Sequence, residues 1–479
     1  MTVARTDVKG NLNGDPNELS SNPAYVLAGL WQSSGLDPAA LHHAVLTGAD
    51  PVMPSSFAVG SAAQTSIAVA ALAACELGHA RGQHRQTVSV DMTHAALECT
   101  GWFSLNGRMP EMWDKFSGAY RCADGWVRIH TNFVHHRDGA LALMGLDAAT
   151  ASRAQAEAVM LTHSAFAFEK AAADAGLVVA AMSTFNEWDA SSQGQAVAQQ
   201  PLISFEKIGN APPRNLASLK PFNRPLHSLR VLDLTRILAG PVCGRALAAY
   251  GAQVMLVNAP HLPNIESIAD TSRGKLSCHV DLRTRAGQAA LNQLAQTAHV
   301  FVQGYRPDAL AALGFDAAAL AERNPGMVYV SLSAYGDQGP WGRRRGFDSL
   351  VQSAMGFNHA EGEAAGSNSP QPLPMQILDY ATGHLMAYAA AAALIKQQQE
   401  GGNWHVKLSL ARTGLWLRSL GRVGNGFAAS QPDRAPYLET ADSGYGELTA
   451  LKHSAHMSAT PPAWSRPSMP PGTHAAVWP

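Results

Sequence analysis

The chain has 479 residues, of which 46% are hydrophobic and 15% are charged, and its formal net charge is -1. This length predicts two or three domains with enough chain to bury a core. The near-neutral balance argues against a protein that binds nucleic acid through a basic surface. The most apolar run, residues 58–77, is rich in alanine and interrupted by polar side chains, so it predicts a buried helix and not a membrane span.

The cysteines and histidines predict neither disulfides nor a metal site. Five cysteines are scattered without CxxC spacing, and their odd number argues against a disulfide framework and for a reducing compartment. The 19 histidines show no HExxH or Cys/His ligand spacing. Residues 1–20 lack the apolar stretch of a signal peptide and predict a polar, disordered tail. We therefore expect a cytoplasmic protein.

Residues 21–215 predict a helical segment followed by a small α+β domain. An alanine-rich helix is expected over residues 58–80. Residues 118–133, GAYRCADGWVRIHTNF, show the alternation and the Asp-Gly turn of a β-hairpin. Residues 171–188 predict a helix, a strand and the start of another helix. Four prolines in residues 211–227 mark a linker at the end of this domain.

From Leu229 onward the chain alternates between apolar strands and helices. Strands are expected within LRVLDLTRILAG, QVMLVNAP, HVFVQGY and MVYVSLSAYG. This alternation predicts an α/β domain with a parallel, doubly wound, Rossmann-like sheet that carries helices on both faces. The absence of G-x-G-x-x-G after the first strand argues against dinucleotide binding. We assign residues 216–425 to this domain and residues 426–479 to an extended C-terminal segment.

An internal repeat contains two alanine-rich helices. A shift of 318 residues places TVSVDMTHAAL (87–97) on HVKLSLARTGL (405–415), and the helix near residues 67–80 on the helix near residues 385–398. Each copy reads as a helix, a polar turn and a strand. The same shift (379 − 61 = 318) places Ser61 on Asp379, so only the second copy has an acid at this position.

Asp379 is the strongest candidate for a functional residue. It directly follows residues 372–378, which contain two prolines, and it precedes the alanine-rich helix that is expected after Thr382 and Gly383. A carboxylate at such a junction accepts backbone N–H groups and lies at the positive end of the helix, so we expect it to be ionised. By itself, the position is also compatible with an ordinary helix N-cap.

Five sequence blocks between Leu229 and about Arg422 carry a family resemblance. They are RVLDLTRILAGP (230–241), RGKLSCHVDLRTRAGQAAL (273–291), VFVQGYRPDALAALGF (300–315), NPGMVYVSLSAYGDQGPWGRRRGFDSLVQSAMGF (324–357) and ILDYATG (377–383). In sequence and order they resemble the class III CoA-transferase family, also called CaiB/BaiF, which includes formyl-CoA transferases, carnitine CoA-transferases and α-methylacyl-CoA racemases. Residues 58–210 resemble the family's second half and residues 448–474 its extended C-terminal segment, so the halves stand in reversed order.

The resemblance implies an acyl-CoA:carboxylate CoA-transferase in which Asp379 is the nucleophile. In family members this carboxylate attacks the acyl-CoA carbonyl and forms a mixed anhydride. The released CoA thiolate converts the anhydride into an enzyme thioester, and an acceptor carboxylate completes the exchange. The resemblance also implies that no cofactor is permanently bound, that coenzyme A enters as part of the substrate, and that the protein forms a homodimer, since family members form interlocked homodimers. The reversed order leaves open whether the N-terminal half completes the fold within one chain or across two. Its partners would be an acyl-CoA donor and a carboxylate acceptor.

The resemblance also assigns residues that would contact coenzyme A. They are Ile237, Leu238 and Ala239 after the first strand, Gly304 and Tyr305 in another turn, and Arg345 near a position that reaches a CoA phosphate. The chain departs from the family at Asn258 and Ala259, where an acid and an arginine are usual. The glycine-rich loop of formyl-CoA transferases has no counterpart near residues 104–117.

Two alternatives to a transferase are open. Racemases of the family carry a histidine where this chain has Phe347, so an isomerase that moves an α-proton would lack one of its two bases. The neighbouring Asp348 is expected to cap the helix that follows it, and His384 to be structural. The second alternative is a non-catalytic acyl-CoA-binding paralogue, which the departures above and Ser61 would fit.

Overall fold

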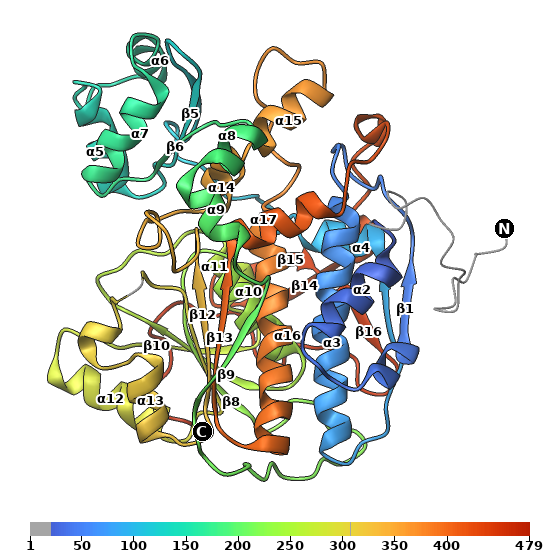
Figure 1. Cartoon of the computed structure of the whole chain (residues 1–479). Helices are drawn as coiled ribbons and strands as arrows, with labels where there is room; N and C mark the ends of the chain where they lie inside the picture. Colours follow the sequence, from blue (N-terminus) through green and yellow to red (C-terminus); the bar gives the residue numbers. More distant parts are fainter. Residues whose placement is uncertain (1–20, 307) are drawn as a thin grey trace.

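A seven-stranded sheet forms the centre of the computed structural model, which describes residues 21–306 and 308–479 (Figure 1). The strand order is β10-β9-β8-β11-β12-β13-β7, and neighbouring strands are parallel except for the last pair. The predicted α/β fold class is confirmed, whereas the tail predicted at residues 1–20 lies outside the described residues. The strands are β7 (Ser204–Gly209), β8 (Arg230–Leu234), β9 (Gln253–Asn258), β10 (Lys275–His279), β11 (Val300–Gln303), β12 (Val328–Ser333) and β13 (Asn403–Ser409).

Helices cover both faces of this sheet, as a doubly wound arrangement requires. One face carries α10 (Ala239–Ala249) and α16 (Ile377–Glu400), and the other carries α12 (Arg285–Ala295) and α13 (Ala317–Arg323). Successive side chains of a strand point to opposite faces, so Val328 and Val330 of β12 join the first core while Tyr329 joins the second. The inner strands β8, β9 and β11 are buried along nearly their whole length, which explains their continuous apolar sequence, whereas the edge strand β7 is partly exposed.

The two copies of the repeat lie side by side in the middle of the molecule (Figure 1). Each copy is a long helix, a strand and a short helix: α3 (Val59–Ala80), β2 (Val88–Asp91) and α4 (Met92–Glu98), then α16, β13 and α17 (Leu410–Ser419). The first residues of α3 and α16 are 318 positions apart (377 − 59), which is the predicted offset. Their alanines are buried where the two helices pack together, because small side chains let helix backbones approach closely.

Among the described helices, α3 is the one that is long and apolar enough to cross a membrane. That property rests on length and composition alone, and its apolar part is entirely buried inside the protein. Burial on all sides is typical of a helix in the core of a folded domain, as the sequence predicted for this stretch.

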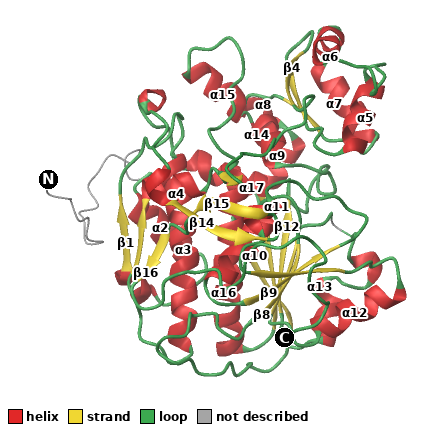
Figure 2. Ribbon diagram, turned by 180° about the vertical axis from the view of Figure 1, so that it is seen from behind, coloured by secondary structure: helices red, strands yellow, loops and turns green. Residues whose placement is uncertain are grey.

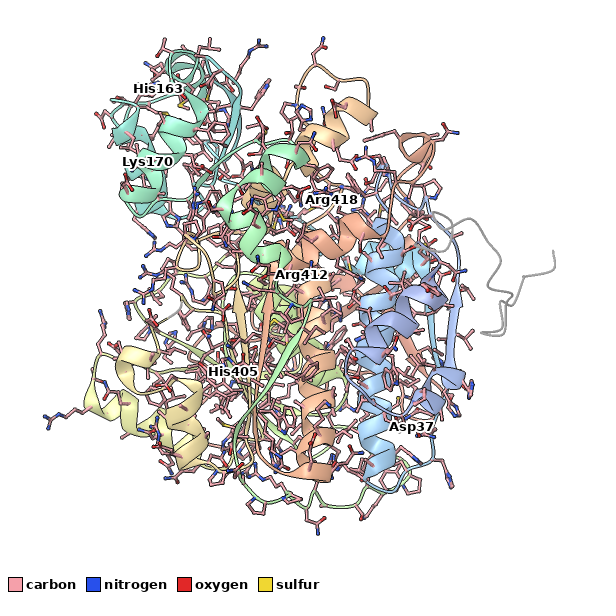
Figure 3. The ribbon with its side chains drawn as sticks, in the orientation of Figure 1. Asp37, His163, Lys170, His405, Arg412 and Arg418 are labelled. Carbon is pink, nitrogen blue, oxygen red and sulfur yellow. The ribbon has the colours of Figure 1, made fainter. Side chains whose placement is uncertain are left out.

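The small domain of the N-terminal half has a sheet and a hydrophobic core of its own (Figure 1). Its elements and the two helices that follow are β4 (Gly118–Arg121), β5 (Trp126–Ile129), α5 (Val134–Leu143), α6 (Arg153–Met160), α7 (Ala165–Asp174), β6 (Val179–Ala181), α8 (Phe185–Ala190) and α9 (Ser192–Ala198). The expected hairpin is β4 and β5, and the expected helix, strand and helix start are α7, β6 and α8. His163 and Lys170 mark the part of this domain that is remote from the large sheet (Figure 3).

The large sheet extends across the boundary expected between residues 215 and 216. β7 precedes this boundary, yet it pairs antiparallel with β13. The linker at residues 211–227 contains no helix or strand, and Arg81 at the end of α3 holds it by donating to the carbonyl oxygens of Ala217 and Pro225. The N-terminal half therefore supplies an edge strand to the sheet of the C-terminal half.

The C-terminal segment pairs with strands of the N-terminal half (Figure 2). β16 pairs with β2 and β15 pairs with β3, so two small sheets join the two ends of the chain. The strands are β1 (Ala44–Thr47), β3 (Phe103–Leu105), β14 (Leu438–Ser443), β15 (Gly446–Leu451) and β16 (Ala455–Met457). The remaining helices are α2 (Pro23–Gln32), η1 (Pro38–His43), α11 (Ile268–Thr271), η2 (Ala311–Leu313), α14 (Asp348–Met355), α15 (Phe357–Ala364), η3 (Gly426–Ala428) and η4 (Ala435–Tyr437).

Candidate active site

Asp379 lies in the first turn of α16, which begins at Ile377, earlier than the sequence predicted. Only 6% of the residue is exposed. The interpretation as an ordinary N-cap is wrong, because Gln376 occupies that position and makes no capping bond through its side chain. Instead, the carboxylate of Asp379 faces the backbone N–H of Ala239, the first residue of α10, which acts to lower its pKa. The candidate acid therefore lies where the N-termini of two helices meet.

The expectation that Asp379 is held ionised is wrong for the protein without substrate. Burial and the neighbouring carboxylate of Asp348 both raise its pKa, and the single N–H from Ala239 lowers it by less. A buried carboxyl group loses the hydration that favours its charged form, so the positive end of α16 does not compensate for this loss. We conclude that Asp379 holds a proton well above the usual pH range of an aspartic acid.

Asp348 does not cap the helix that it begins, contrary to the prediction. Phe347 is the N-cap of α14, and it makes no capping bond through its side chain. The carboxylate of Asp348 instead accepts the N–H groups of Leu378 and Asp379, with 2.9 Å between Oδ2 and the nitrogen of Asp379. Burial raises the pKa of Asp348 to about 7, although these hydrogen bonds act to lower it. One helix thus supplies the capping carboxylate of another.

Close contact between α10 and α16 brings Ala239 to Asp379. Gly383 lies one turn after Asp379, and a Cβ at Gly383 would stand 2.5 Å from the carbonyl oxygen of Ala239. Ile237, just before α10, has a φ of 74°, which is uncommon for a branched side chain and lets the chain turn sharply from β8 into the helix. The glycine and this turn bring the N-terminus of α10 close to Asp379.

A cavity of about 400 Å³ adjoins this pair of helix ends. Four of the residues assigned to coenzyme A line it, namely Ile237, Gly304, Tyr305 and Arg345. Leu238 and Ala239 do not line it, because their side chains are buried beneath the turn. Asp379 is not among the lining residues, but two lining residues are close in sequence to groups that contact it. Ile237 lies two residues before Ala239, and Phe347 directly precedes Asp348.

The N-terminal half closes this cavity within the same chain. Phe133, His135 and His136 of the small domain line it together with residues of the large sheet. Arg345 donates to the Nε2 atom of His136 over 3.3 Å, and Ser183 after β6 donates its N–H to the carbonyl oxygen of Ser353 in α14 at 3.2 Å. The sequence could not place these histidines, because the contacts that bring them to the cavity join the two halves of the chain.

The cavity is positively charged. Arg236, Arg306, Arg344 and Arg345 line it, and its described lining contains no acidic side chain. Arg344 forms an ion pair with Glu169 at 3.1 Å, whereas the other three make no ion pair within the described parts of the chain. Unpaired guanidinium groups around a hollow bind phosphate and carboxylate groups well. Sequence reasoning missed Arg236 and Arg306, because a single arginine in a turn resembles an ordinary solvated charge.

Three buried histidines do not replace the histidine base that racemases of the family carry at the position of Phe347. The ring of His130 stacks on Phe347 with 4.1 Å between centroids, and burial lowers the pKa of His130 to about 3. His136 is on the cavity wall, but its pKa is lowered to about 4, and its Nε2 atom accepts the bond from Arg345. His384 is buried beside Glu98 and His453, away from the cavity lining. All three are weak bases in this protein.

A second cavity of about 450 Å³ shares Tyr305 and Arg306 with the first. It lies along the carboxyl ends of β11, β12 and β13, and both polar and apolar side chains line it. His405 on β13 (Figure 3) lines it and bonds to the Oγ atom of Ser331 at 2.8 Å. By contrast, Asn258 is 1% exposed and adjoins a pocket of only about 10 Å³, and neither atom of its amide has a partner among the described residues.

A known protein family matches the C-terminal half of this chain. The model of a family described as CoA-transferase family III matches residues 226–443, which include β8 to β13, both candidate carboxylates and all six residues assigned to coenzyme A. Residues 226–443 belong to CoA-transferase family III. The resemblance found from the sequence motifs is therefore confirmed for this half.

Several curated proteins named as CoA transferases are similar to this chain. A probable fatty acyl-CoA transferase of Mycobacterium tuberculosis is 34% identical over 229 residues, which cover 44% of this chain and 58% of the relative. An acyl-CoA transferase of Gibberella moniliformis is 28% identical over 384 residues, or 72% of this chain and 68% of the relative. A succinate–glutarate CoA-transferase of Agrobacterium fabrum is 34% identical over 206 residues, or 39% and 51%. The chain thus spans about half to two thirds of the length of these relatives.

Solved structures give similar coverage. A crystal structure of the M. tuberculosis protein Rv3272 is 34% identical, with a TM-score of 0.38, and the match covers 41% of this chain and 59% of that one. A CaiB/BaiF family protein from Brucella suis is 26% identical, with a TM-score of 0.37 and coverage of 47% and 65%.

Proposed function

We propose that the protein is an acyl-CoA:carboxylate CoA-transferase that forms an aspartyl-CoA thioester on Asp379. The observation that supports this most is the position of Asp379, a buried carboxyl group that faces the N–H of Ala239 beside a cavity lined by arginines. Family III membership of residues 226–443 supports the same reaction class. The donor is an acyl-CoA, the acceptor is a carboxylate, and no permanently bound cofactor takes part.

The proposed reaction begins with ionised Asp379, which attacks the thioester carbonyl and expels CoA thiolate, leaving a mixed anhydride. The thiolate attacks the aspartyl carbonyl, forms the enzyme thioester and releases the donor's carboxylate. The acceptor carboxylate then attacks the thioester, expels CoA thiolate and forms a second mixed anhydride. The thiolate attacks the acceptor's carbonyl in this anhydride, which gives the new acyl-CoA and restores the aspartate carboxylate. The N–H of Ala239 is placed to donate to the oxyanion that forms at the aspartyl carbonyl. Burial keeps water from hydrolysing the anhydride.

Binding of coenzyme A is assigned to the arginine-lined cavity. Arg236, Arg306 and Arg345 would hold phosphate groups, and Ile237, Gly304 and Tyr305 would line the rest of the path. Asn258 and Ala259 supply neither the acid nor the arginine usual at these positions, so the three arginines would carry the electrostatic attraction. We extend the proposal to a homodimer in the cytoplasm, on the basis of the family resemblance and the cysteine pattern.

The rival functions fit the site less well. An isomerase needs a second base opposite Asp379, and Phe347 together with the weakly basic His130 and His136 does not supply it. A non-catalytic binding protein has no need for a buried acid that faces an N–H donor. This second rival has a distinct outcome in the experiment that follows.

Intact-protein mass spectrometry tests the proposal. The protein is incubated with fatty acyl-CoA, succinyl-CoA and glutaryl-CoA, and we expect a covalent CoA adduct that hydroxylamine removes and that maps to Asp379. The adduct should be lost in Asp379→Ala, because the nucleophile is gone. It should persist in Asp174→Ala, which changes a 66% exposed side chain on α7. Binding of CoA without an adduct from any thioester would favour the non-catalytic paralogue, and an adduct that survives in Asp379→Ala would overturn the assignment.

A further inference from the structure

The extended segment before α16 is held by side chains of α14. Gln352 accepts the N–H of Leu373 at 3.0 Å and donates to the carbonyl oxygen of Met375 at 3.3 Å. The same Nε2 atom also donates to Asp348, whose carboxylate accepts the N–H groups at the start of α16. Asp348 and Gln352 are both fully buried. We call these two residues the α14 clamp.

The N-terminal copy of the repeat has a matching carboxylate. Asp50 accepts the N–H of Gly60 at 3.1 Å and the N–H of Ser61 at 2.8 Å, the second and third residues of α3. Leu378 and Asp379 are the second and third residues of α16 and bond to Asp348 in the same way. Each long helix is therefore capped at equivalent N–H groups by a carboxylate from outside the helix. The copies differ at the third residue, which is Ser61 in one and Asp379 in the other.

We propose that Asp348, held by Gln352, is a positioning residue that orients Asp379 for nucleophilic attack. This proposal rests on the proposed function of Asp379. The clamp fixes the first turn of α16 against the N-terminus of α10, so the attacking oxygen keeps its alignment with the N–H of Ala239. α14 also accepts the N–H of Ser183 from the small domain, so docking of that domain supports the clamp.

Asp348 has a second effect, because a carboxylate next to Asp379 makes ionisation of Asp379 harder. The charged group that faces this pair from β5 is Arg128, which acts on Asp348 in the opposite direction. A transferase that needs ionised Asp379 loses activity as pH falls below the pKa of Asp379. If Asp348 becomes a neutral asparagine, that pKa falls, and the acid limb of the pH profile moves to lower pH.

The test compares Asp348→Asn, Gln352→Leu and the wild type in CoA exchange over a range of pH. Asp348→Asn should shift the acid limb downward by roughly one pH unit. It should also lower kcat about tenfold or more, with KM for the acyl-CoA nearly unchanged, because the lost contact orients the nucleophile and does not bind substrate. Gln352→Leu should lower kcat and leave the acid limb near its wild-type position, since the charge of Asp348 remains.

Asp50→Asn is the matched control, because it weakens the equivalent cap on a helix without an acid at the third position. We expect its kcat and acid limb to equal those of the wild type. Amide hydrogen exchange of residues 373–385 gives a readout that does not depend on activity, and Asp348→Asn and Gln352→Leu should speed exchange there while Asp50→Asn should not. Unchanged kcat, acid limb and amide exchange in Asp348→Asn would overturn the clamp. If the wild type shows no CoA exchange, the proposed function is contradicted. The amide hydrogen exchange would still test whether Asp348 and Gln352 hold the start of α16.

Discussion

Asp379 and Asp348 are two buried carboxyl groups that are joined through the N–H of Asp379. Each has a pKa above the ordinary carboxyl range, chiefly because of burial. The folded protein therefore holds protons that the unfolded chain would release between about pH 4 and pH 7. When the folded state binds more protons than the unfolded state, stability falls as pH rises through that window. The candidate site thus costs stability at neutral pH.

Replacing Asp379 by asparagine should remove much of this cost. The side chain keeps its shape but no longer ionises, so we expect Asp379→Asn to raise the free energy of unfolding at pH 7.5 by roughly 1 to 3 kcal/mol. At pH 3 the gain should nearly vanish, because Asp379 is then protonated in both the folded and the unfolded state. Thermal unfolding at the two pH values measures the difference. Equal midpoints for wild type and variant at pH 7.5 would contradict the raised pKa, and Asp174→Asn on the surface of α7 serves as the control.

The contact between α10 and α16 is the feature that matters at the scale of the elements. Helices with small side chains at their contact can approach closely, and here a Cβ on residue Gly383 would stand only 2.5 Å from the carbonyl oxygen of Ala239. That contact sets the distance between the N-terminus of α10 and the acid of α16. Gly383 therefore fits here because it has no side chain. This outweighs the loss of about 1 kcal/mol in helix stability that glycine causes relative to alanine.

Gly383→Ala should test this contact. The added Cβ would stand 2.5 Å from the carbonyl oxygen of Ala239 and 2.8 Å from the side chain of Val242, so the helices must separate. We expect a loss of about 1 to 3 kcal/mol of stability and a lower rate of adduct formation. The matched control is Gly29→Ala in α2, where a Cβ would meet nothing within 4 Å and alanine should stabilise the helix slightly. Stability above wild type in Gly383→Ala would show that the contact is loose.

For the molecule as a whole, the main finding is that one chain closes the candidate site from both of its halves. The small domain supplies Phe133, His135 and His136, the loops that follow strands of the large sheet supply the arginines, and α16 supplies Asp379. The C-terminal strands then pair with β2 and β3, which holds the two halves together. In this structure, both halves of one chain therefore contribute to the candidate site.

Mixing two inactive variants should distinguish a site within one chain from a site shared between chains. One chain carries Asp379→Ala, and the other carries Phe133→Asp, which places a carboxylate in the cationic cavity and should repel CoA phosphates. If each site lies within one chain, unfolding and refolding the mixture should restore no CoA exchange. Activity above that of the separate variants would mean that the small domain of one chain completes the candidate site on the large sheet of another chain.

Local patterns in the sequence determined the fold class, the hairpin of the small domain, the offset of 318 between the copies and the location of Asp379 near a helix start. These features depend on periodicity, turn residues and helix propensity, which short stretches of sequence contain. The sequence also indicated four residues of the cavity wall, although through family motifs and not through physical pattern.

Only the tertiary structure decided which groups surround Asp379. The N–H of Asp379 bonds to a residue 31 positions away, and Arg345 meets His136 across 209 positions, so no local pattern could pair them. The ionisation of Asp379 was wrongly expected for the same reason, because desolvation and a neighbouring carboxylate depend on how the whole chain packs. Hydrogen-bond partners and burial are properties of the assembled fold, whereas helix and strand periodicity are properties of neighbouring residues.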